Sequence, residues 1–444
     1  MLLEFTISNY RSIKEKTTFS LIAEPARSKS DNIFAAEIAK KEKVRLLKTA
    51  AIYGPNASGK TNILKAFNAF VMFIVDSNLK AGEDISFYDP FTFDKATEST
   101  PTYFCLSFIG PQNVKYVYEF EYNSQEIISE NLFYYPKGSK TILFTRSKDT
   151  DPEDLIHLGK LGSIYRNKEI KVFKNKLILS KFGEDEPHEL LSLVYIHFLK
   201  YKFLNLNSRN RTINRQRFEL NELFVTDKWF QDSINFLINS GDLMINEIQI
   251  TENNQEDLKF QGELPESIKK RLFREFKYKI AGNHNYFDGE RLIGQKSLPI
   301  SQESKGTEIL YDLGGTILKS LNDGSVLFVD ELETSLHPNL CKLLIDIFQS
   351  PSLNTNGSQL IFTTHDVTLL DKSLFRKDQI WICQKDKFGS TDVYSIQDFK
   401  EVREETPFAR WYLAGKFGGL PKIKYSNDLF SSIPLKHVEK DNPL

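Results

Sequence analysis

The stretch YGPNASGKTNILKAF, residues 53–67, decides the fold. From Gly54 to Thr61 it matches the pattern G-x-x-x-x-G-K-[ST] at every fixed position. The preceding run LLKTAAIYG is short and apolar, which predicts a buried strand, and NILKAFNAFVMFIVDSN has helical periodicity. A glycine loop between a strand and a helix points successive backbone N–H groups at an anion. The stretch therefore predicts a phosphate-binding loop in an α/β fold.

This loop supplies most of the candidate binding residues. We expect Lys60 to reach the outer phosphates of ATP and to act in catalysis, and the Thr61 hydroxyl to ligate Mg²⁺. ATP and Mg²⁺ are thus the expected cofactors. The residues predicted to bind them here are Gly54, Pro55, Asn56, Ala57, Ser58, Gly59, Lys60, Thr61 and Asn62.

Two later apolar runs also end in polar residues. In VLFVDE, residues 326–331, Asp330 is predicted to hold Mg²⁺ and Glu331 to orient and deprotonate the attacking water. QLIFTTHDVTLL, residues 359–370, places His365 at a strand end, where an imidazole can bond a γ-phosphate and report its loss. Together these residues predict an ATPase that converts ATP and water to ADP and phosphate, slowly and in a regulatory role.

Composition excludes several other classes of protein. The chain has 444 residues, with 35 Phe and 18 Tyr for a sizeable core and a formal net charge of −1. Any anionic partner must therefore be met by a local patch. The three cysteines lack metal-ligand spacing, which predicts reduced thiols. We find neither a signal-peptide pattern nor an apolar run of ~20 residues, so we expect a cytoplasmic protein.

The remaining pattern divides the chain into parts. Alternation predicts two strands within residues 1–23 and an antiparallel meander over residues 98–135, laid beside the first sheet. Residues 185–280 have a more helical and charged pattern, and α/β character resumes near residue 305 with TEILYDLGGTILKSL. A long insertion therefore separates the two halves of the nucleotide site.

Further motifs resemble those of a known family. Ser304-Lys305-Gly306-Thr307 opens a predicted helix, and V-D-E at 329–331, S-L-H-P at 335–338 and T-T-H at 363–365 follow it. With the glycine loop, these residues look like ABC-type ATPases, and more narrowly like the soluble branch that includes SMC, RecF and related DNA-repair proteins. E-S-K-G-T at 303–307 and W-Y-L-A-G-K-F-G-G-L-P at 411–421 are most similar to the AAA family ATPases of anti-phage abortive-infection systems of the RloA, PARIS and Septu type. The resemblance covers roughly residues 1–130 and 295–425.

The resemblance implies a two-lobed ATPase head with an antiparallel β subdomain and a short helical lid in place of a long coiled coil. It implies lobe I at 1–180, with Walker A and the β meander, and a helical insertion at 181–295. Lobe II at 296–400 would carry the signature, Walker B, D-loop and H-switch, and a C-terminal extension at 401–444 would follow.

It also implies an assembly. Ser304 and Gly306 would contact the γ-phosphate of ATP bound to a second copy, giving a head-to-tail dimer or larger oligomer. Arg11 falls where the family has a basic residue on the nucleotide, although an ordinary surface arginine fits the sequence equally well. The family's Q-loop glutamine is missing from residues 86–94, so its replacement is open. Glu303 differs from the transporter signature and argues against a transporter ATPase.

Two functional readings follow. The preferred one is a sensor ATPase of a prokaryotic anti-phage defence system that controls a separate effector, such as a nuclease or toxin, and responds to a phage-derived trigger. The alternative is a RecF-like, ATP-dependent DNA-binding clamp in DNA repair. The basic stretch KYKFLNLNSRNRTINRQRF, residues 200–218, could bind nucleic acid or form a solvated face. The apolar spacing of KKRLFREFKYK, residues 269–279, predicts a core face.

Overall fold

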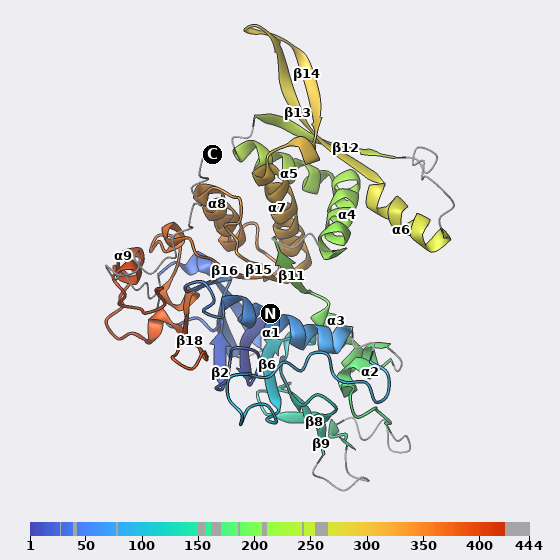
Figure 1. Cartoon of the computed structure of the whole chain (residues 1–444), viewed down its shortest axis with the longest axis vertical. Coiled ribbons are helices and arrows are strands. Elements are labelled where there is room, and N and C mark those ends of the chain that lie inside the picture. The colour runs from blue at the N-terminus through green and yellow to red at the C-terminus, as the bar shows by residue number, and fades with distance from the viewer. Residues whose placement is uncertain are drawn as a thin grey trace, which may run out of the picture.

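The computed structural model describes residues 1–26, 28–38, 42–76, 79–148, 156–160, 170–184, 187–206, 211–241, 244–253 and 265–421. In Figure 1 an antiparallel sheet and α1 form the lower part, and a parallel sheet crosses the middle. Helices cover the upper face of the parallel sheet, and a narrow arm of strands projects above them. The phosphate loop lies between the lower part and the central sheet.

The lower sheet confirms the predicted N-terminal strands and the meander, which share one sheet. Alternation along its strands places every second side chain in the core, as in KYVYEFEY. Its strand order is β10 (Ile156–His157), β9 (Thr141–Ser147), β8 (Ile127–Tyr134), β7 (Lys115–Tyr122), β6 (Thr102–Ile109), β1 (Leu2–Ser8) and β2 (Thr17–Ser20).

The central sheet positions the site. Its first five strands run parallel, and the inner ones are buried and mostly apolar, as a sheet covered on both sides requires. Because parallel strands end at one edge, the residues that follow β5, β15 and β16 meet there. The strand order is β11 (Tyr201–Asn205), β15 (Val326–Asp330), β16 (Gln359–Thr363), β5 (Thr49–Tyr53), β17 (Ile380–Lys385) and the antiparallel β18 (Thr391–Ser395).

Helix α1 (Lys60–Val75) joins the two sheets. Its Phe67 ring lies 4.1 Å from that of Phe5 in the lower sheet and 4.7 Å from that of Phe328 in the central sheet. The short helices α2 (Ile178–Glu184) and α3 (Leu191–Phe198) flank α1. This shared aromatic core fixes the start of α1, and hence the phosphate loop, against both sheets.

The opposite face of the central sheet is covered by α4 (Arg211–Thr226), α5 (Lys228–Ser240), α7 (Lys305–Asp323) and α8 (Pro338–Gln349). Helix α7 is the one that TEILYDLGGTILKSL predicts. The Ser304 side chain caps its start, and Gly324 ends it at φ 64°, a conformation that glycine adopts without steric cost.

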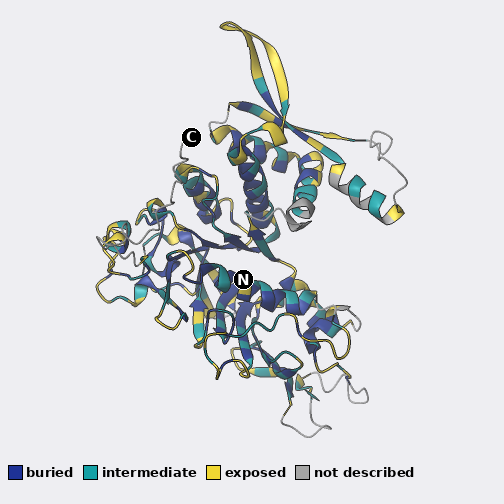
Figure 2. Ribbon diagram, viewed as in Figure 1, coloured by how far each residue is buried: buried dark blue, intermediate teal, exposed yellow. Residues whose placement is uncertain are grey.

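The middle region is not wholly helical, and this corrects the prediction for residues 185–280. It supplies β11 to the central sheet, and β12 (Ile245–Glu252), β13 (Tyr278–Asp288) and β14 (Arg291–Pro299) form the arm. Only α6 (Glu266–Phe276) separates β12 from β13 among the described residues, and Phe276 is half exposed, so the predicted core face is incomplete. Figure 2 shows that most of the arm is exposed. No long coiled coil is present among the described residues.

Smaller elements complete the fold. A two-stranded sheet pairs β3 (Ile33–Ile38) with β4 (Glu42–Leu47), and α9 (Phe408–Leu413) lies near the phosphate loop. The short 3-10 helices are η1 (Ser30–Asn32), η2 (Pro111–Asn113), η5 (Ile300–Gln302), η6 (Val367–Leu369), η7 (Lys377–Gln379) and η8 (Ile396–Asp398).

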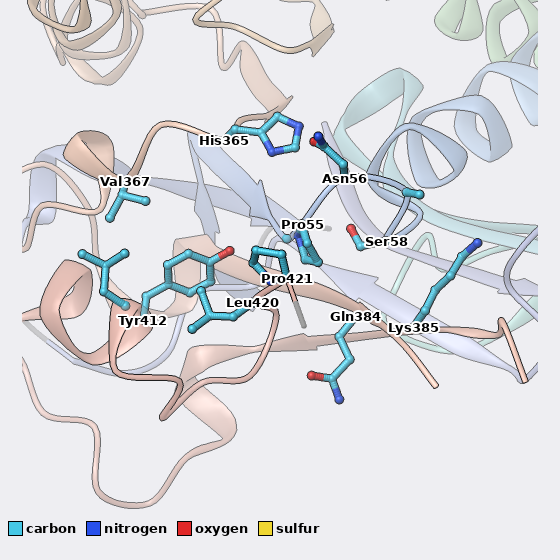
Figure 3. A pocket seen from close by; sticks show the side chains of 13 residues that line it. Pro55, Asn56, Ser58, His365, Val367, Gln384, Lys385, Tyr412, Leu420 and Pro421 are labelled. Atoms are coloured by element: carbon cyan, nitrogen blue, oxygen red, sulfur yellow. The ribbon is translucent and has the colours of Figure 1, made fainter. Parts of the chain in front are cut away.

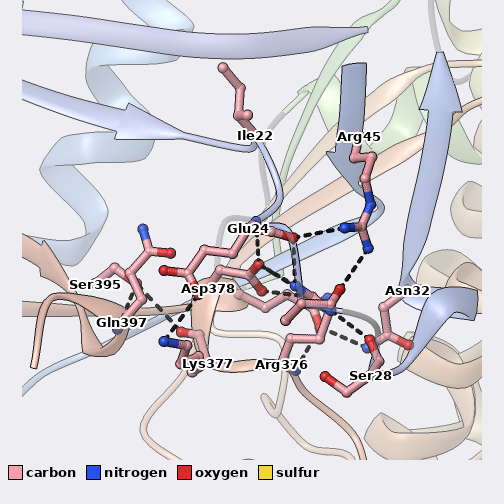
Figure 4. A network of polar contacts seen from close by, with 12 residues as sticks. Ile22, Glu24, Ser28, Asn32, Arg45, Arg376, Lys377, Asp378, Ser395 and Gln397 are labelled. Carbon is pink, nitrogen blue, oxygen red and sulfur yellow. Dashed lines mark hydrogen bonds and ion pairs between the residues drawn. The ribbon is translucent and has the colours of Figure 1, made fainter. Parts of the chain in front are cut away.

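A buried ion pair ties distant segments together (Figure 4). The guanidinium of Arg376 bonds Asp378 at 2.7 Å and donates to the carbonyl oxygens of Ser28 and Glu24. Both charged side chains are almost fully buried, and such a pair is tolerated only when its remaining donors are satisfied. The N-terminal segment is thereby fastened beside β17.

Two further predictions can be checked against the fold. Cys105, Cys341 and Cys383 are all free thiols, as expected. Within the described ranges, no helix has the length and apolar character needed to cross a membrane.

Candidate nucleotide-binding site

The glycine loop connects β5 to α1, as the sequence predicts. Gly59 has φ 107°, and a Cβ at this position would lie 2.2 Å from the Thr391 hydroxyl, so only glycine fits. Thr391 on β18 also donates a hydrogen bond to the carbonyl of Ser58. The loop is therefore held from behind by a strand that lies far away in the sequence.

Lys60 lies under the loop with its ammonium turned back on it. The Nζ donates to the carbonyls of Gly54 at 2.8 Å and Pro55 at 3.2 Å, and lies 3.1 Å from the Nε2 of His365. Burial lowers the pKa of Lys60, because nearby acidic groups offset the desolvation of its ammonium only in part. Phosphate oxygens would be stronger partners for this ammonium than carbonyls, so the cradle suits an anionic ligand.

Thr61 and Asp330 meet at the start of α1. The Thr61 hydroxyl lies 3.1 and 3.2 Å from the two carboxylate oxygens of Asp330. A hydroxyl and a carboxylate are among the oxygen ligands that Mg²⁺ uses together with substrate phosphates. The described residues contain no cluster of three or more His, Cys, Asp or Glu that could hold a metal alone. The chemistry of the Thr61–Asp330 pair fits Mg²⁺ as a ligand set.

Thr363, at the end of β16, organises both acidic residues and was missed at the sequence level. Its hydroxyl donates to Asp330 Oδ1 at 2.7 Å and accepts from the Glu331 backbone N–H at 2.8 Å. Glu331 has φ 55°, an unusual conformation for a residue with a side chain. Only the motif T-T-H, residues 363–365, could have pointed to this hydroxyl.

His365 is held beside Lys60 and Glu331. Its backbone N–H donates to Glu333 Oε1 at 2.6 Å, and its Nε2 lies 4.0 Å from Glu331 Oε1. Burial, followed by the charge of Lys60, lowers the pKa of His365. The imidazole is therefore neutral near pH 7 and can donate one hydrogen bond and accept another. Glu333 was not anticipated as its anchor.

A cavity of ≈ 680 Å³ opens in front of the loop. Figure 3 shows Pro55, Asn56 and Ser58 on one side, and Tyr412 with Leu420 on another. Gly54 and Ala57 of the loop also line it. The C-terminal segment thus forms one wall of the cavity in front of the glycine loop, whereas the sequence identified this segment only by its resemblance to other proteins.

Arg11 and Asn62 lie together beside the loop. Arg11 donates from Nε to the Asn62 side chain at 3.0 Å, and its guanidinium pairs with Asp89 at 2.6 Å. Asn62 in turn donates to Ser12. Arg11 is therefore no isolated surface arginine. Asp89 belongs to residues 86–94, where the expected glutamine is missing.

The signature residues are not brought to the loop of their own chain. Ser304 accepts from the Thr307 N–H at 3.1 Å, and a Cβ on Gly306 would lie 3.1 Å from the carbonyl of Ser335. Across the described ranges, the hydrogen bonds of the Ser304 side chain go to Thr307, and none joins Ser304 to residues 54–61. The composite site with a second copy therefore stays a prediction.

The basic stretch at 200–218 differs from an open patch. Lys202 lies on β11 and donates to Asp323 at 2.6 Å, and Arg217 bonds Asp312 through two nitrogens. Among the other predicted cations, Lys200 is exposed. Arg209 lies outside the described residues, as do the side chains of Arg211 and Arg215. The cations of Lys202 and Arg217 are thus matched within the fold, which weakens the predicted nucleic-acid contact.

Comparison with known families identifies a domain family that spans most of the chain. The family model described as "AAA domain, putative AbiEii toxin, Type IV TA system" matches residues 50–371, which include the loop, Asp330, Glu331 and His365. The chain belongs to this AAA domain family. The family implies use of a nucleotide, and the mixed α/β fold that the sequence predicts for this AAA protein is confirmed. The comparison with curated proteins found no match to this chain.

Solved structures add distant likenesses. The SMC head domain from Thermotoga maritima is 12% identical over 89% of this chain and 98% of that chain, with a TM-score of 0.37. A structure of the recombination mediator protein RecF with ATP, in the RecFOR pathway, is 15% identical over 89% of this chain and 99% of that chain, with a TM-score of 0.35. Similarity this low gives no basis for assigning the function of either protein to this chain.

Proposed function

We propose that this chain binds and hydrolyses ATP with Mg²⁺, pairs head to tail around ATP, and so controls a separate effector of an anti-phage defence system. One observation carries the enzymatic part of the proposal: Lys60, the Thr61–Asp330 pair, Glu331 and His365 converge on one glycine loop. Each has the chemistry that phosphoryl transfer to water needs.

Each of these residues would have a separate role in ATP hydrolysis. Lys60 would exchange its carbonyl partners for the outer phosphates, and Thr61 with Asp330 would hold the magnesium ion, which neutralises phosphate charge. The Glu331 carboxylate is partly exposed and would orient and deprotonate the attacking water. The neutral ring of His365 would bond the γ-phosphate and lose that partner after hydrolysis.

Pairing would use the start of α7. The N–H groups in the first turn of a helix have no partner within the helix, and they suit an anion. Gly306 lies in this turn and has no side chain, so a phosphate on a second copy could approach the backbone closely. Because such a dimer would form only with ATP bound, the surface that the protein presents to an effector would depend on ATP.

The effector role rests on the family. Its description refers to a toxin and to a toxin–antitoxin system, which supports the proposal that this ATPase acts with a toxin or nuclease. The DNA-clamp alternative would need an open basic surface, and the internal pairing of Lys202 and Arg217 does not favour it. We therefore prefer the sensor that controls an effector.

The test is ATP turnover by the purified chain and by Glu331→Gln, with particle mass measured with and without ATP. We expect slow turnover, loss of turnover in Glu331→Gln, and a doubling of mass that requires ATP. Equal turnover in both proteins would exclude Glu331 as the general base. An unchanged particle mass on addition of ATP would exclude the ATP-dependent dimer.

A further inference from the structure

A second cavity of ≈ 670 Å³ lies at the base of the arm and contains no residue of the phosphate loop. Residues of helices α4 and α6, strands β12, β13 and β14, and the η5 turn directly before the signature line it. Figure 1 shows how these helices and strands meet where the arm begins. Its volume falls in the range of ~300–1,000 Å³ typical of small-molecule sites. Nothing in the proposed ATPase cycle uses this cavity.

Two basic side chains, Arg217 and Lys279, line the wall of this arm-base cavity, and the Arg217 guanidinium is paired with Asp312. Among the described residues that line the cavity there is no Asp or Glu. Arg217 donates hydrogen bonds to the Asp312 carboxylate through Nε and one terminal nitrogen. Its second terminal nitrogen carries two further N–H groups that can donate hydrogen bonds to a ligand. Uncharged side chains that can hydrogen-bond also line the cavity: Gln249, Thr251, Ser297 and Ser301. This lining favours an anion that also carries polar groups.

Aromatic rings complete the wall. The rings of Phe218 and Tyr278 lie 5.6 Å apart, and Phe276 is half exposed at the same cavity. The ammonium of Lys277 lies 4.7 Å from the centre of the Tyr278 ring, and it pairs with Glu252 at 3.8 Å. Aromatic faces beside cations are the combination that holds a stacked base and its phosphate.

We propose that the arm-base cavity binds a nucleotide, with the base on the aromatic rings and the phosphate on Arg217 and Lys279. The nucleotide can be free or can be the phosphorylated end of a strand, because both present the same base and phosphate. This site is separate from the ATP site in front of residues 54–61.

Two contacts connect the cavity to the signature helix. Arg217 bonds Asp312, and Asn221 accepts from the Tyr311 hydroxyl at 2.8 Å. Tyr311 and Asp312 both lie on α7, which begins after Ser304. A ligand in the cavity would therefore touch residues that are bonded directly to that helix.

The experiment uses the full chain with Lys60→Ala, so that nucleotide held by the phosphate loop does not contribute. AMP is titrated by calorimetry into this protein and into versions that also carry Lys279→Glu or Lys296→Glu. Lys296 is an exposed lysine on β14 that does not line the cavity, so it is matched for charge change and location on the arm. Thermal unfolding of each variant verifies that the fold persists.

We expect AMP to bind saturably, Lys279→Glu to weaken it by about tenfold or more, and Lys296→Glu to leave the affinity unchanged. Adenosine and inorganic phosphate should each bind more weakly than AMP. A 5′-phosphorylated oligothymidylate that binds more tightly than AMP assigns the nucleotide to a strand end, and weaker binding assigns it to a free nucleotide. No saturable binding of either probe, phosphate binding as tight as AMP binding, or equal effects of the two lysine variants would overturn the proposal. None of these outcomes depends on ATP hydrolysis at the phosphate loop.

Discussion

Replacing Thr363 with valine should weaken Mg²⁺ binding while the protein still folds. Valine keeps the shape of threonine but loses the hydroxyl that bonds Asp330 Oδ1 at 2.7 Å and receives the Glu331 N–H at 2.8 Å. A hydrogen bond to a charged group contributes about 1.5–3 kcal/mol. Removing a partner that orients a metal ligand typically costs about 10- to 100-fold in metal affinity or activity.

We therefore expect Thr363→Val to raise the Mg²⁺ concentration that gives half-maximal ATP turnover by about 10- to 100-fold. The maximal rate should also fall, because Glu331 loses its backbone anchor. The assay is phosphate release as a function of Mg²⁺ at saturating ATP. Thr363→Ser restores the hydroxyl and should recover most of the Mg²⁺ affinity.

The matched control is Thr316→Val on α7. Thr316 is also buried, and its hydroxyl donates to the backbone carbonyl of Asp312. This control should leave the Mg²⁺ dependence unchanged even if it lowers the melting temperature. Identical Mg²⁺ curves for Thr363→Val and wild type would refute the argument that Thr363 orients Asp330.

Three other substitutions test the proposed roles. Lys60→Ala removes the cation under the loop and should weaken ATP binding by about 100-fold or more, measured by calorimetry. Tight ATP binding by this variant would contradict the assignment of residues 54–61 as the phosphate-binding loop. Glu331→Gln should bind ATP but turn it over at least about 100-fold more slowly, and near-normal phosphate release would exclude Glu331 as base. Ser304→Arg should leave single-chain ATP binding intact but block ATP-dependent pairing in light scattering. Pairing that survives Ser304→Arg would contradict the composite site.

Much of the fold follows from local pattern. The alternation of KYVYEFEY predicts β7, and the apolar runs before Gly54, Asp330 and Thr364 predict the buried parallel strands β5, β15 and β16. Parallel strands end at one edge, so their order in the sheet explains how Thr61 and Asp330 meet although they are 269 residues apart. Here the motifs and the topology agree.

Other features depend on tertiary contacts that a local pattern does not contain. KYKFLN, residues 200–205, carries two lysines in a short stretch, yet it forms β11 because it pairs with residues 326–330 of β15. The charge of Lys202 is matched by Asp323, a partner 121 residues away. The role of Thr363 is similarly hidden, since a single threonine at the end of a strand has no signature of its own.

The most direct test of the central claim is the native mass and composition of Glu331→Gln, purified with ATP and Mg²⁺ from its own host. Loss of the base should trap the ATP-bound state, so we predict a particle with two or more copies of the chain, bound ATP and a second, smaller protein. A single chain, or a bare dimer that retains DNA, would contradict the account of an ATPase that controls a separate effector.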